Sequence, residues 1–265
     1  MDTLNTKLSI SILFSYTIYF YYFILSALYI MKFKKERLLI IAPHADDEIL
    51  GCYSLIKKVK DNGGEVFVQI LSLGGYEKIE GKRITKEDWA QELANVSQHL
   101  QIDDYDIAFA NNEFQWIDAK PKHELISYIE SKSKISISKI KPTIVAIPTI
   151  FSSHQDHTYA YKVAITALRP HPQKITHMPQ LVLSYESPEY YFWSAYSEFG
   201  RFQPNLYLNL TKNEITKKAE IVNMYSTQLR KSQRSGESSF SLAKVRGNEI
   251  GTEYAEAFHI NRLYV

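Results

Sequence analysis

The chain has 265 residues, which is enough for one sizeable α/β domain with its own hydrophobic core. Its net charge is +2 and its isoelectric point is about 8.3, so nothing indicates bulk binding to nucleic acid. The single cysteine, Cys52, excludes an internal disulfide and any cysteine-rich metal site.

The first segment, Leu8–Met31, carries no charged residue and is long enough to span a bilayer as a helix. Four basic residues follow it, against Lys7 alone before it, so the positive-inside rule predicts that the remaining chain is cytoplasmic. We therefore expect residues 1–37 to form a transmembrane anchor with a basic juxtamembrane segment, and residues 38–265 to form the functional domain.

Two alternatives remain for this segment. A cleavable signal peptide is disfavoured, because the apolar run is too long and no small-x-small cleavage site follows it. Alternatively, translation starts at Met31 and gives a soluble cytoplasmic protein, since Met31 leads directly into the first predicted strand.

The apolar run from Leu38 to Ala42 predicts a buried strand, and His44, Asp46, Asp47 and Glu48 follow it. In open α/β sheets, ligands bind beyond the carboxyl ends of strands. An imidazole and a carboxylate three residues apart, as in His44 and Asp47, can hold one divalent metal, and Asp46 offers a further carboxylate. Acidic residues also favour a helix N-terminus, which would explain the three carboxylates but not His44.

Alternating elements follow. Apolar residues at helical spacing from Ile49 to Val59 predict a helix that stops at Asn62-Gly63-Gly64. The next predicted elements are a strand at Val66–Leu71 with a flexible Gly74-Gly75 turn over the site, a helix at 86–100, a strand at Tyr105–Phe109, a helix around Leu125–Ile129, a strand at 143–148 and a helix near 157–168. This alternation predicts a Rossmann-like, doubly wound, mostly parallel sheet.

A second cluster, His154, Asp156 and His157, follows the strand at 143–148. One cluster alone could be a helix start with incidental histidines, but two clusters after buried strands favour a shared site. In a 3-2-1-4-5 strand order, the first strand and the strand at 143–148 are neighbours at the switch point, which brings the clusters together.

The rest of the chain predicts an extension of the sheet. Strands are expected at Leu181–Tyr185 and Asn205–Leu210, and a long helix is expected from Thr211 to Leu229. The polar tract Gln233–Ser241 predicts a flexible loop at the mouth of the site.

These motifs resemble a known family. His44-Ala45-Asp46-Asp47-Glu48 is similar to the His-Pro-Asp-Asp-Glu signature of the PIG-L/LmbE-like zinc-dependent N-acetylglucosamine deacetylases, and His154–His157 is similar to their His-x-x-His motif. The likeness covers roughly residues 38–262, including Phe202–Asn205, Arg246–Gly251 and Tyr254–Phe258. Ala42-Pro43-His44 departs from the usual Ala-His-Pro but keeps the spacing of the metal-facing residues.

The resemblance implies a zinc ion held by His44, Asp47 and His157, with another divalent metal such as Fe²⁺ as an alternative. Residue spacing allows this set of ligands but does not single it out. The resemblance also implies that Asp46 is the general base and that His154 lies beside the developing oxyanion. Asp156 would orient a histidine or cap a helix.

Outer residues are open to two interpretations. Arg169, Glu186, Arg246 and Glu256 could bind sugar hydroxyls or form surface ion pairs. Asn111-Asn112-Glu113-Phe114 stands where the family has Asp-Asn-Arg-Phe, which puts the usual sugar contacts in doubt.

The expected activity is hydrolysis of an N-acetyl group on an N-acetylglucosamine-type conjugate, lipid-linked or nucleotide-linked. The alternatives are a zinc amidase for another acyl group of a sugar or thiol conjugate, and an inactive sugar-binding module of envelope assembly. The intact set of metal and base residues disfavours the inactive module. No nucleic-acid partner is expected.

Overall fold

The structure is a computed structural model that describes residues 33, 35–74, 76–77, 83–111, 116–172, 176–193, 200–227 and 232–264. Within these residues, none of the helices combines the length and the apolar character that crossing a bilayer requires. The segment Leu8–Met31 lies outside them, so the predicted anchor and the division of the chain after residue 37 stay predictions.

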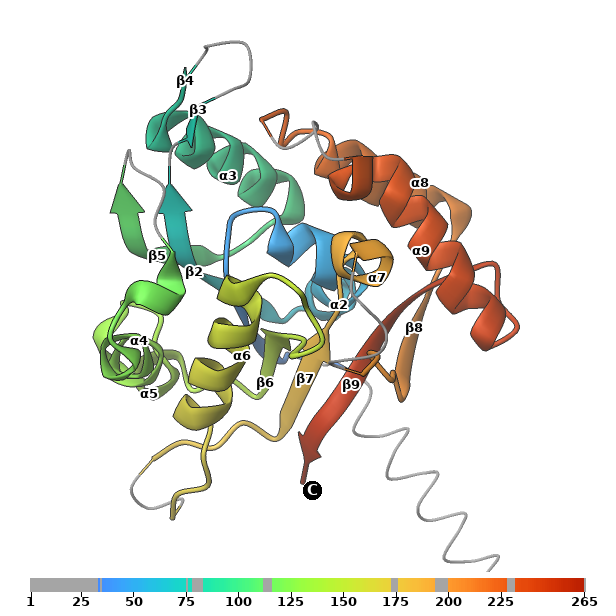
Figure 1. The fold of residues 1–265 in the computed structure, drawn as a ribbon. Coiled ribbons are helices and arrows are strands. Elements are labelled where there is room, and N and C mark those ends of the chain that lie inside the picture. Colours follow the sequence, from blue (N-terminus) through green and yellow to red (C-terminus); the bar gives the residue numbers. More distant parts are fainter. Residues whose placement is uncertain are drawn as a thin grey trace, which may run out of the picture.

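A seven-stranded, mostly parallel sheet forms the centre of the molecule (Figure 1). Its order is β5-β2-β1-β6-β7-β9-β8, and the first five strands are parallel, while β9 runs antiparallel to both β7 and β8. The strands are β1 (Arg37–Ala42), β2 (Glu65–Gly74), β5 (Asp104–Asn111), β6 (Ile144–Pro148), β7 (Leu181–Tyr185), β8 (Leu206–Leu210) and β9 (Tyr254–Leu263). The predicted α/β fold and the 3-2-1-4-5 order of its parallel strands are confirmed.

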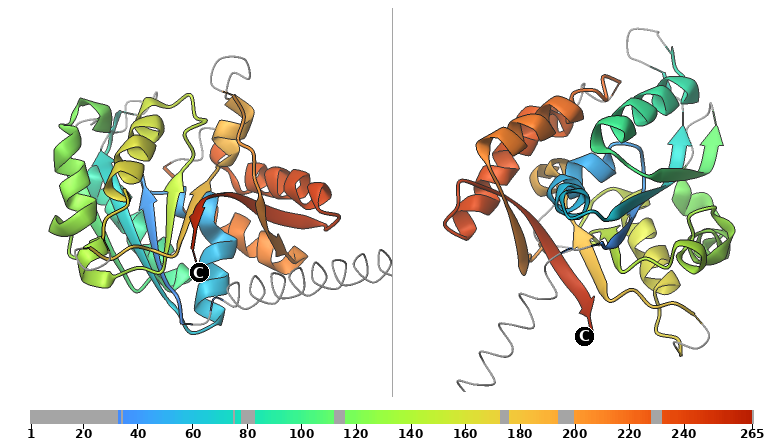
Figure 2. Two further views of the ribbon diagram at one scale, coloured as in Figure 1. Left: turned by 90° about the horizontal axis from the view of Figure 1, so that it is seen from below. Right: turned by 180° about the vertical axis from the view of Figure 1, so that it is seen from behind.

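Helices cover both faces of the sheet (Figure 2). One face packs against α2 (Asp47–Asp61), α3 (Lys86–Leu100), α8 (Lys212–Val222) and α9 (Gly236–Glu249). The other face packs against α4 (Lys122–Ser127), α5 (Ile137–Ile140) and α6 (Gln155–Ala167). Along β1, Leu38 and Ile40 join the first core and Leu39 and Ile41 join the second. A strand buried on both faces reads as a continuous apolar run, which is why β1 was recognisable.

The predicted loop at Gln233–Ser241 is wrong. A 3₁₀ turn at Ser232–Arg234 leads into α9, and the Ser235 hydroxyl caps α9 by accepting the N–H of Ser238 at 3.2 Å. Small residues let α9 lie close to α8, since a Cβ on Gly236 would come within 2.6 Å of the Ala219 carbonyl oxygen. A helix that buries small and polar residues has no apolar periodicity to recognise.

Other differences concern element ends and short elements. The helix predicted to reach Leu229 ends at Val222, because the Asn223 side chain accepts the N–H of Gly236 and Tyr225 turns inward to Glu48. Strand β9, helix α5, helix α7 (Pro188–Trp193) and the small hairpin β3 (Tyr76–Glu77) and β4 (Arg83–Ile84) were not predicted.

Candidate active site

The loop after β1 presents the first cluster in a constrained conformation. Asp46 precedes α2 with φ 116° and ψ −26°, a region that non-glycine residues rarely occupy. Two hydrogen bonds hold this turn: the His44 N–H donates to Asp47 Oδ2 and the Asp46 N–H donates to Glu48 Oε2, both at 3.0 Å. Glu48 is fixed in turn by the Tyr225 hydroxyl at 2.6 Å. Such strain is typical of functional sites.

The loop after β6 supplies the second cluster at the start of α6. His154 is the N-cap, and its Nδ1 accepts the N–H of Asp156 at 3.3 Å. Accepting a hydrogen at Nδ1 places the ring hydrogen of a neutral His154 on Nε2. The helix-cap interpretation of Asp156 is therefore wrong, because His154 fills that position.

His44, Asp47 and His157 converge on one point from the two loops. Their ligand atoms lie within 4.8 Å of one another, and Asp47 Oδ2 is 3.6 Å from His44 Nδ1 and 3.4 Å from His157 Nε2. Tetrahedral zinc with ligand distances near 2 Å separates its ligand atoms by roughly 3.3 Å. Asp47 and His157 are buried. This donor set fits a zinc ion.

Asp156 orients the most exposed of these three residues. His44 Nε2 donates to Asp156 Oδ2 at 2.8 Å, which leaves Nδ1 directed toward Asp47. The second oxygen of Asp156 accepts the Ile117 N–H at 3.0 Å. A carboxylate that fixes the tautomer of a ligating histidine is a common feature of zinc sites. The expectation that Asp156 orients a histidine is confirmed geometrically.

Burial and neighbouring charges set the protonation of the two partly buried histidines, His44 and His154, in the metal-free protein. Burial lowers the pKa of His44, but its hydrogen bonds to Asp156 and Asp47 outweigh this and raise that pKa to about 9. Burial, followed by the charge of His44, lowers the pKa of His154 to about 4. His154 is therefore a neutral imidazole near pH 7, a hydrogen-bond donor and not a positive charge.

Asp46 is buried beside the candidate metal ligands but is not part of their cluster. Its Oδ2 lies 3.4 Å from Arg234 Nη1, and Arg234 Nε donates to the buried Glu189 on α7. Burial raises the pKa of Asp46 well above its usual value, and the charge of Arg234 partly opposes this rise. Neither Arg234 nor Glu189 was identified from the sequence, because each lies far along the chain from the motifs.

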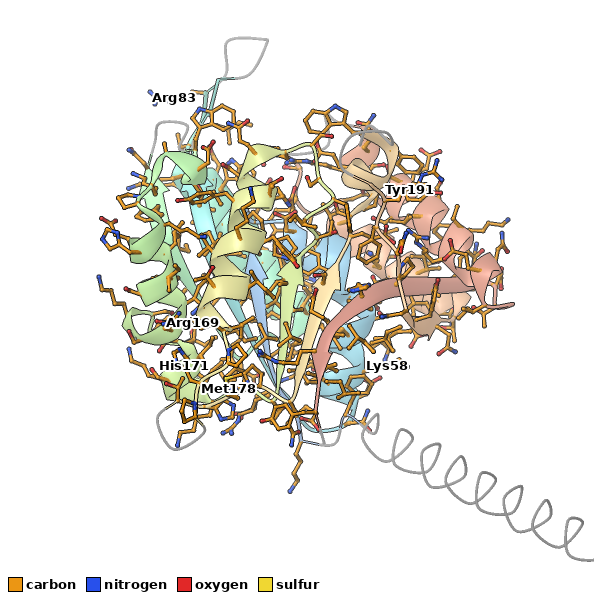
Figure 3. All side chains as sticks on the ribbon, turned by 60° about the horizontal axis from the view of Figure 1, so that its bottom comes forward. Lys58, Arg83, Arg169, His171, Met178 and Tyr191 are labelled. Atoms are coloured by element: carbon orange, nitrogen blue, oxygen red, sulfur yellow. The ribbon has the colours of Figure 1, made fainter. Side chains whose placement is uncertain are left out.

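The outer residues divide into three kinds. Arg169 forms an exposed ion pair with Glu130 at 2.5 Å, and Figure 3 shows it toward the opposite end of the domain from Tyr191. Glu256 is buried, and its carboxylate accepts hydrogen bonds from Lys218 and Ser54, so its role is structural. Glu186 and Arg246 form a buried bidentate pair, and Asn112–Phe114 lie outside the described residues.

The part of the chain that carries both clusters matches a known protein family. The PIG-L family model, described as GlcNAc-PI de-N-acetylase, matches residues 39–168, a range that contains every residue of both clusters. The chain belongs to the PIG-L/LmbE-like deacetylase family. No curated protein sequence matches the chain.

Solved structures share the PIG-L fold at low identity. The conserved protein TT1542 from Thermus thermophilus matches with a TM-score of 0.64 and 22% identity, over 87% of this chain and 97% of its own. N,N'-diacetylchitobiose deacetylase from Pyrococcus horikoshii matches at 0.62 and 18%, over 85% and 83%. The hydratase GalB from Pseudomonas putida matches at 0.62 and 16%, over 87% and 98%. At these identities, the likeness establishes the fold alone.

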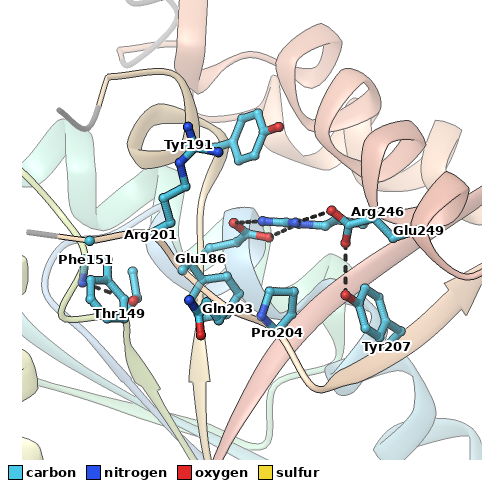
Figure 4. Close-up of a pocket in the computed structure, with 12 residues that line it drawn as sticks. Thr149, Phe151, Glu186, Tyr191, Arg201, Gln203, Pro204, Tyr207, Arg246 and Glu249 are labelled. Atoms are coloured by element: carbon cyan, nitrogen blue, oxygen red, sulfur yellow. Dashed lines mark hydrogen bonds and ion pairs between the residues drawn. The ribbon is translucent and has the colours of Figure 1, made fainter. Parts of the chain in front are cut away.

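A pocket of about 430 Å³ in this PIG-L protein is lined partly by the β6 and β7 loops (Figure 4). A chain of polar contacts runs along it: Glu186 pairs with Arg246, Arg246 pairs with Glu249 at 2.6 Å, and Glu249 accepts the Tyr207 hydroxyl at 3.0 Å. The Tyr191 ring lies 5.2 Å from the Arg246 guanidinium. The volume lies within the range of small-molecule sites.

Proposed function

We propose that this protein is a zinc-dependent deacetylase that hydrolyses the N-acetyl amide of an N-acetylated amino sugar. The observation that carries this proposal is the different placement of two adjacent carboxylates in the first loop. Asp47 joins two histidines in a cluster of possible metal ligands, whereas Asp46 lies outside that cluster. Membership of the PIG-L family supports the amide as the reacting bond and an acetylated sugar as the substrate class.

His44, Asp47 and His157 would hold the metal, and their spacing and the burial of Asp47 and His157 fit it. When bound, zinc supplies a Lewis acid that polarises the amide carbonyl and makes water more acidic. The same three ligand types would also accept Fe²⁺. Asp156 keeps His44 in the tautomer that offers Nδ1 to the metal.

Asp46 acts as general base and then as general acid. It takes a proton from the attacking water as the new C–O bond forms, and it delivers that proton to the amine nitrogen as the C–N bond breaks. The products are acetate and the free amino sugar. Burial raises the pKa of Asp46, which makes this carboxylate a stronger base towards the attacking water than an exposed one would be.

His154 stabilises the charge that develops on the carbonyl oxygen. Its ring centroid lies 5.2 Å from those of both His44 and His157, and its Nε2 carries the hydrogen that would be donated. A donor aimed at a developing oxyanion contributes a few kcal/mol, roughly 10²-fold to 10³-fold in rate.

A second candidate arises because a hydratase has this fold. Hydration adds water to an unsaturated substrate and releases no acetate, so the two reactions have different products. An amidase for another acyl group would release a different acid. The match to a de-N-acetylase family model favours deacetylation over both.

The test combines metal analysis with product analysis. Purified protein is analysed for zinc and iron and then incubated with a panel of N-acetylglucosamine conjugates, lipid-linked and nucleotide-linked. We expect stoichiometric metal, acetate release and loss of activity in chelator that zinc restores. Metal-loaded protein that releases no acetate from any conjugate would contradict the proposal.

A further inference from the structure

The sequence contains three tryptophans, and two of them lie at the candidate active site. Trp89 is a core residue of α3. The ring centroids of Trp116 and Trp193 each lie 6.4 Å from that of His154. Their side chains are 44% and 52% exposed, so neither ring is held in the hydrophobic core. Exposed aromatic rings beside a candidate active site are available to contact a bound substrate.

In the strand order, the two tryptophans come from opposite sides of the metal cluster. Trp116 lies beyond β5 and Trp193 ends α7, which follows β7, while the metal cluster lies beyond β1 and β6 between those strands. The rings are tilted by 40° and 82° relative to the His154 ring. The two rings therefore present different orientations to His154.

The segment that carries each tryptophan is connected to one carboxylate of the site. Trp116 precedes Ile117, whose N–H donates to Asp156 at 3.0 Å. Trp193 lies on the same short helix as Glu189, and Glu189 accepts from Arg234, which in turn contacts Asp46. The chain segments that carry the tryptophans are thus held by contacts to Asp156 and, through Glu189 and Arg234, to Asp46.

We propose that Trp116 and Trp193 form the binding surface for the sugar ring that bears the acetamide. This inference rests on the proposed function. In the proposed reaction, the amide carbonyl lies at the metal cluster and beside His154. The group bonded to the amide nitrogen then lies about one ring's width away, close to the two tryptophans. In an amino sugar, that group is the pyranose ring. One face of a pyranose presents C–H bonds, and these pack favourably on the electron-rich face of an indole.

The kinetic test uses full-length, zinc-loaded protein and two amides: methyl N-acetylglucosaminide, and N-acetylethanolamine, which has the same amide without a ring. Trp116→Ala and Trp193→Ala are each expected to raise KM for the pyranoside and lower kcat/KM by about tenfold. Their kcat and zinc content, and their rate on the acyclic amide, should stay within about twofold. Trp→Tyr at either position should recover most of the loss.

Phe192→Ala is the matched control. Phe192 is 47% exposed and lies beside Trp193 on α7, but its ring contacts Tyr191. It should leave the kinetics of both amides unchanged. Unchanged pyranoside kinetics in both tryptophan variants would overturn the inference and leave the proposed function standing, and so would an equal loss on the acyclic amide.

Tryptophan fluorescence gives a readout that does not need turnover. Methyl N-acetylglucosaminide should change the emission of wild type saturably, and replacing both tryptophans by Phe should abolish the change and leave the steady Trp89 signal. If wild type releases no acetate but shows this response, the proposed function fails and the sugar surface stands. No response to sugar, or a response only to anionic phospholipid vesicles, would overturn the sugar surface.

Discussion

At the scale of single residues, Asp156 affects the competition between a proton and a metal ion for Nδ1 of His44. His44 has a pKa raised to about 9 in the metal-free protein by its carboxylate partners, so at pH 7 both of its ring nitrogens carry hydrogens. Metal binding at Nδ1 must displace one of these protons. Apparent zinc affinity should therefore rise by roughly tenfold per pH unit up to about pH 9.

Calorimetry checks this in buffers of different ionisation enthalpy at pH 7, where wild type should release about one proton from His44 on binding zinc. Asp156→Asn removes the hydrogen bond that raises this pKa most, so fewer protons should be released. The same variant should bind zinc roughly 10-fold to 100-fold more weakly, because His44 loses its orienting partner. Equal proton release in wild type and Asp156→Asn would contradict the assigned role.

The adjacent carboxylates Asp46 and Asp47 should separate in their effects. Asp47→Ala and His157→Ala should each lose zinc, because a three-ligand set cannot lose one member and keep its affinity. Asp46→Asn should keep near-stoichiometric zinc and lose at least ~10²-fold in turnover, as expected for a general base. Metal analysis and acetate release distinguish these outcomes. Zinc retained in both ligand variants would refute the ligand assignment, and near-normal turnover of Asp46→Asn would remove Asp46 from the mechanism.

The sequence allowed us to predict those site residues that lie close to one another along the chain. His44 and Asp47 lie three apart, as do His154 and His157, so each pair is visible within one turn of chain. Arg234 is 188 positions from Asp46, and an arginine in a polar tract has no pattern that would connect it to the site. Trp193 was not identified from the sequence either, because α7, the helix on which it lies, was not predicted.

At the scale of elements, a buried ion pair joins α2, α8 and β9. Lys218 Nζ donates to the Leu50 carbonyl oxygen and to Glu256 Oε1, both at 2.7 Å, and Glu256 Oε2 accepts from Ser54. These contacts hold α2, whose first turn carries Asp47. Glu186 and Arg246 similarly join the loop after β7 to α9.

Lys218→Met should destabilise the protein by about 3–5 kcal/mol, because it leaves the Glu256 carboxylate buried without its partner. Denaturant unfolding of the metal-loaded protein measures this change. The matched control is Lys217→Met on the same helix, where the lysine side chain is 54% exposed and pairs loosely with Glu220. That variant should stay within about 0.5 kcal/mol of wild type. Equal effects of the two variants would show that the buried pair does not stabilise the contact.

The correctly predicted helices and strands are those in which burial produces a regular pattern of apolar residues. Strand β1 and strand β6 are buried at nearly every position, and α3 shows Trp89, Leu93, Val96 and Leu100 at helical spacing. Helix α9 buries Gly236, Ser238 and Ser239 against a close neighbour, so its composition indicates a loop although its packing forms a helix. Strand β9 is fixed by antiparallel pairing with β7 and β8, a long-range contact that no local pattern encodes.

At the scale of the whole molecule, we propose that the predicted anchor would bring the enzyme to a substrate at the membrane surface. Leu8–Met31 is expected to span the membrane, with the basic residues after it keeping the catalytic domain in the cytoplasm. The full-length protein should then remain with the membrane fraction through high-salt and alkaline washes. Release by salt alone would mean that the association is peripheral.

A chain that begins at Met31 separates anchoring from catalysis. It should be soluble and should deacetylate short, water-soluble substrates at the full-length rate, because both metal-binding loops follow β1 and lie beyond Met31. It should lose rate on lipid-linked substrates, since the anchor raises their effective concentration at the active site. Acetate release from paired soluble and lipid-linked substrates measures the difference. Equal losses on both substrates, or an unfolded truncated chain, would mean that the first thirty residues pack against the domain and contribute to its stability.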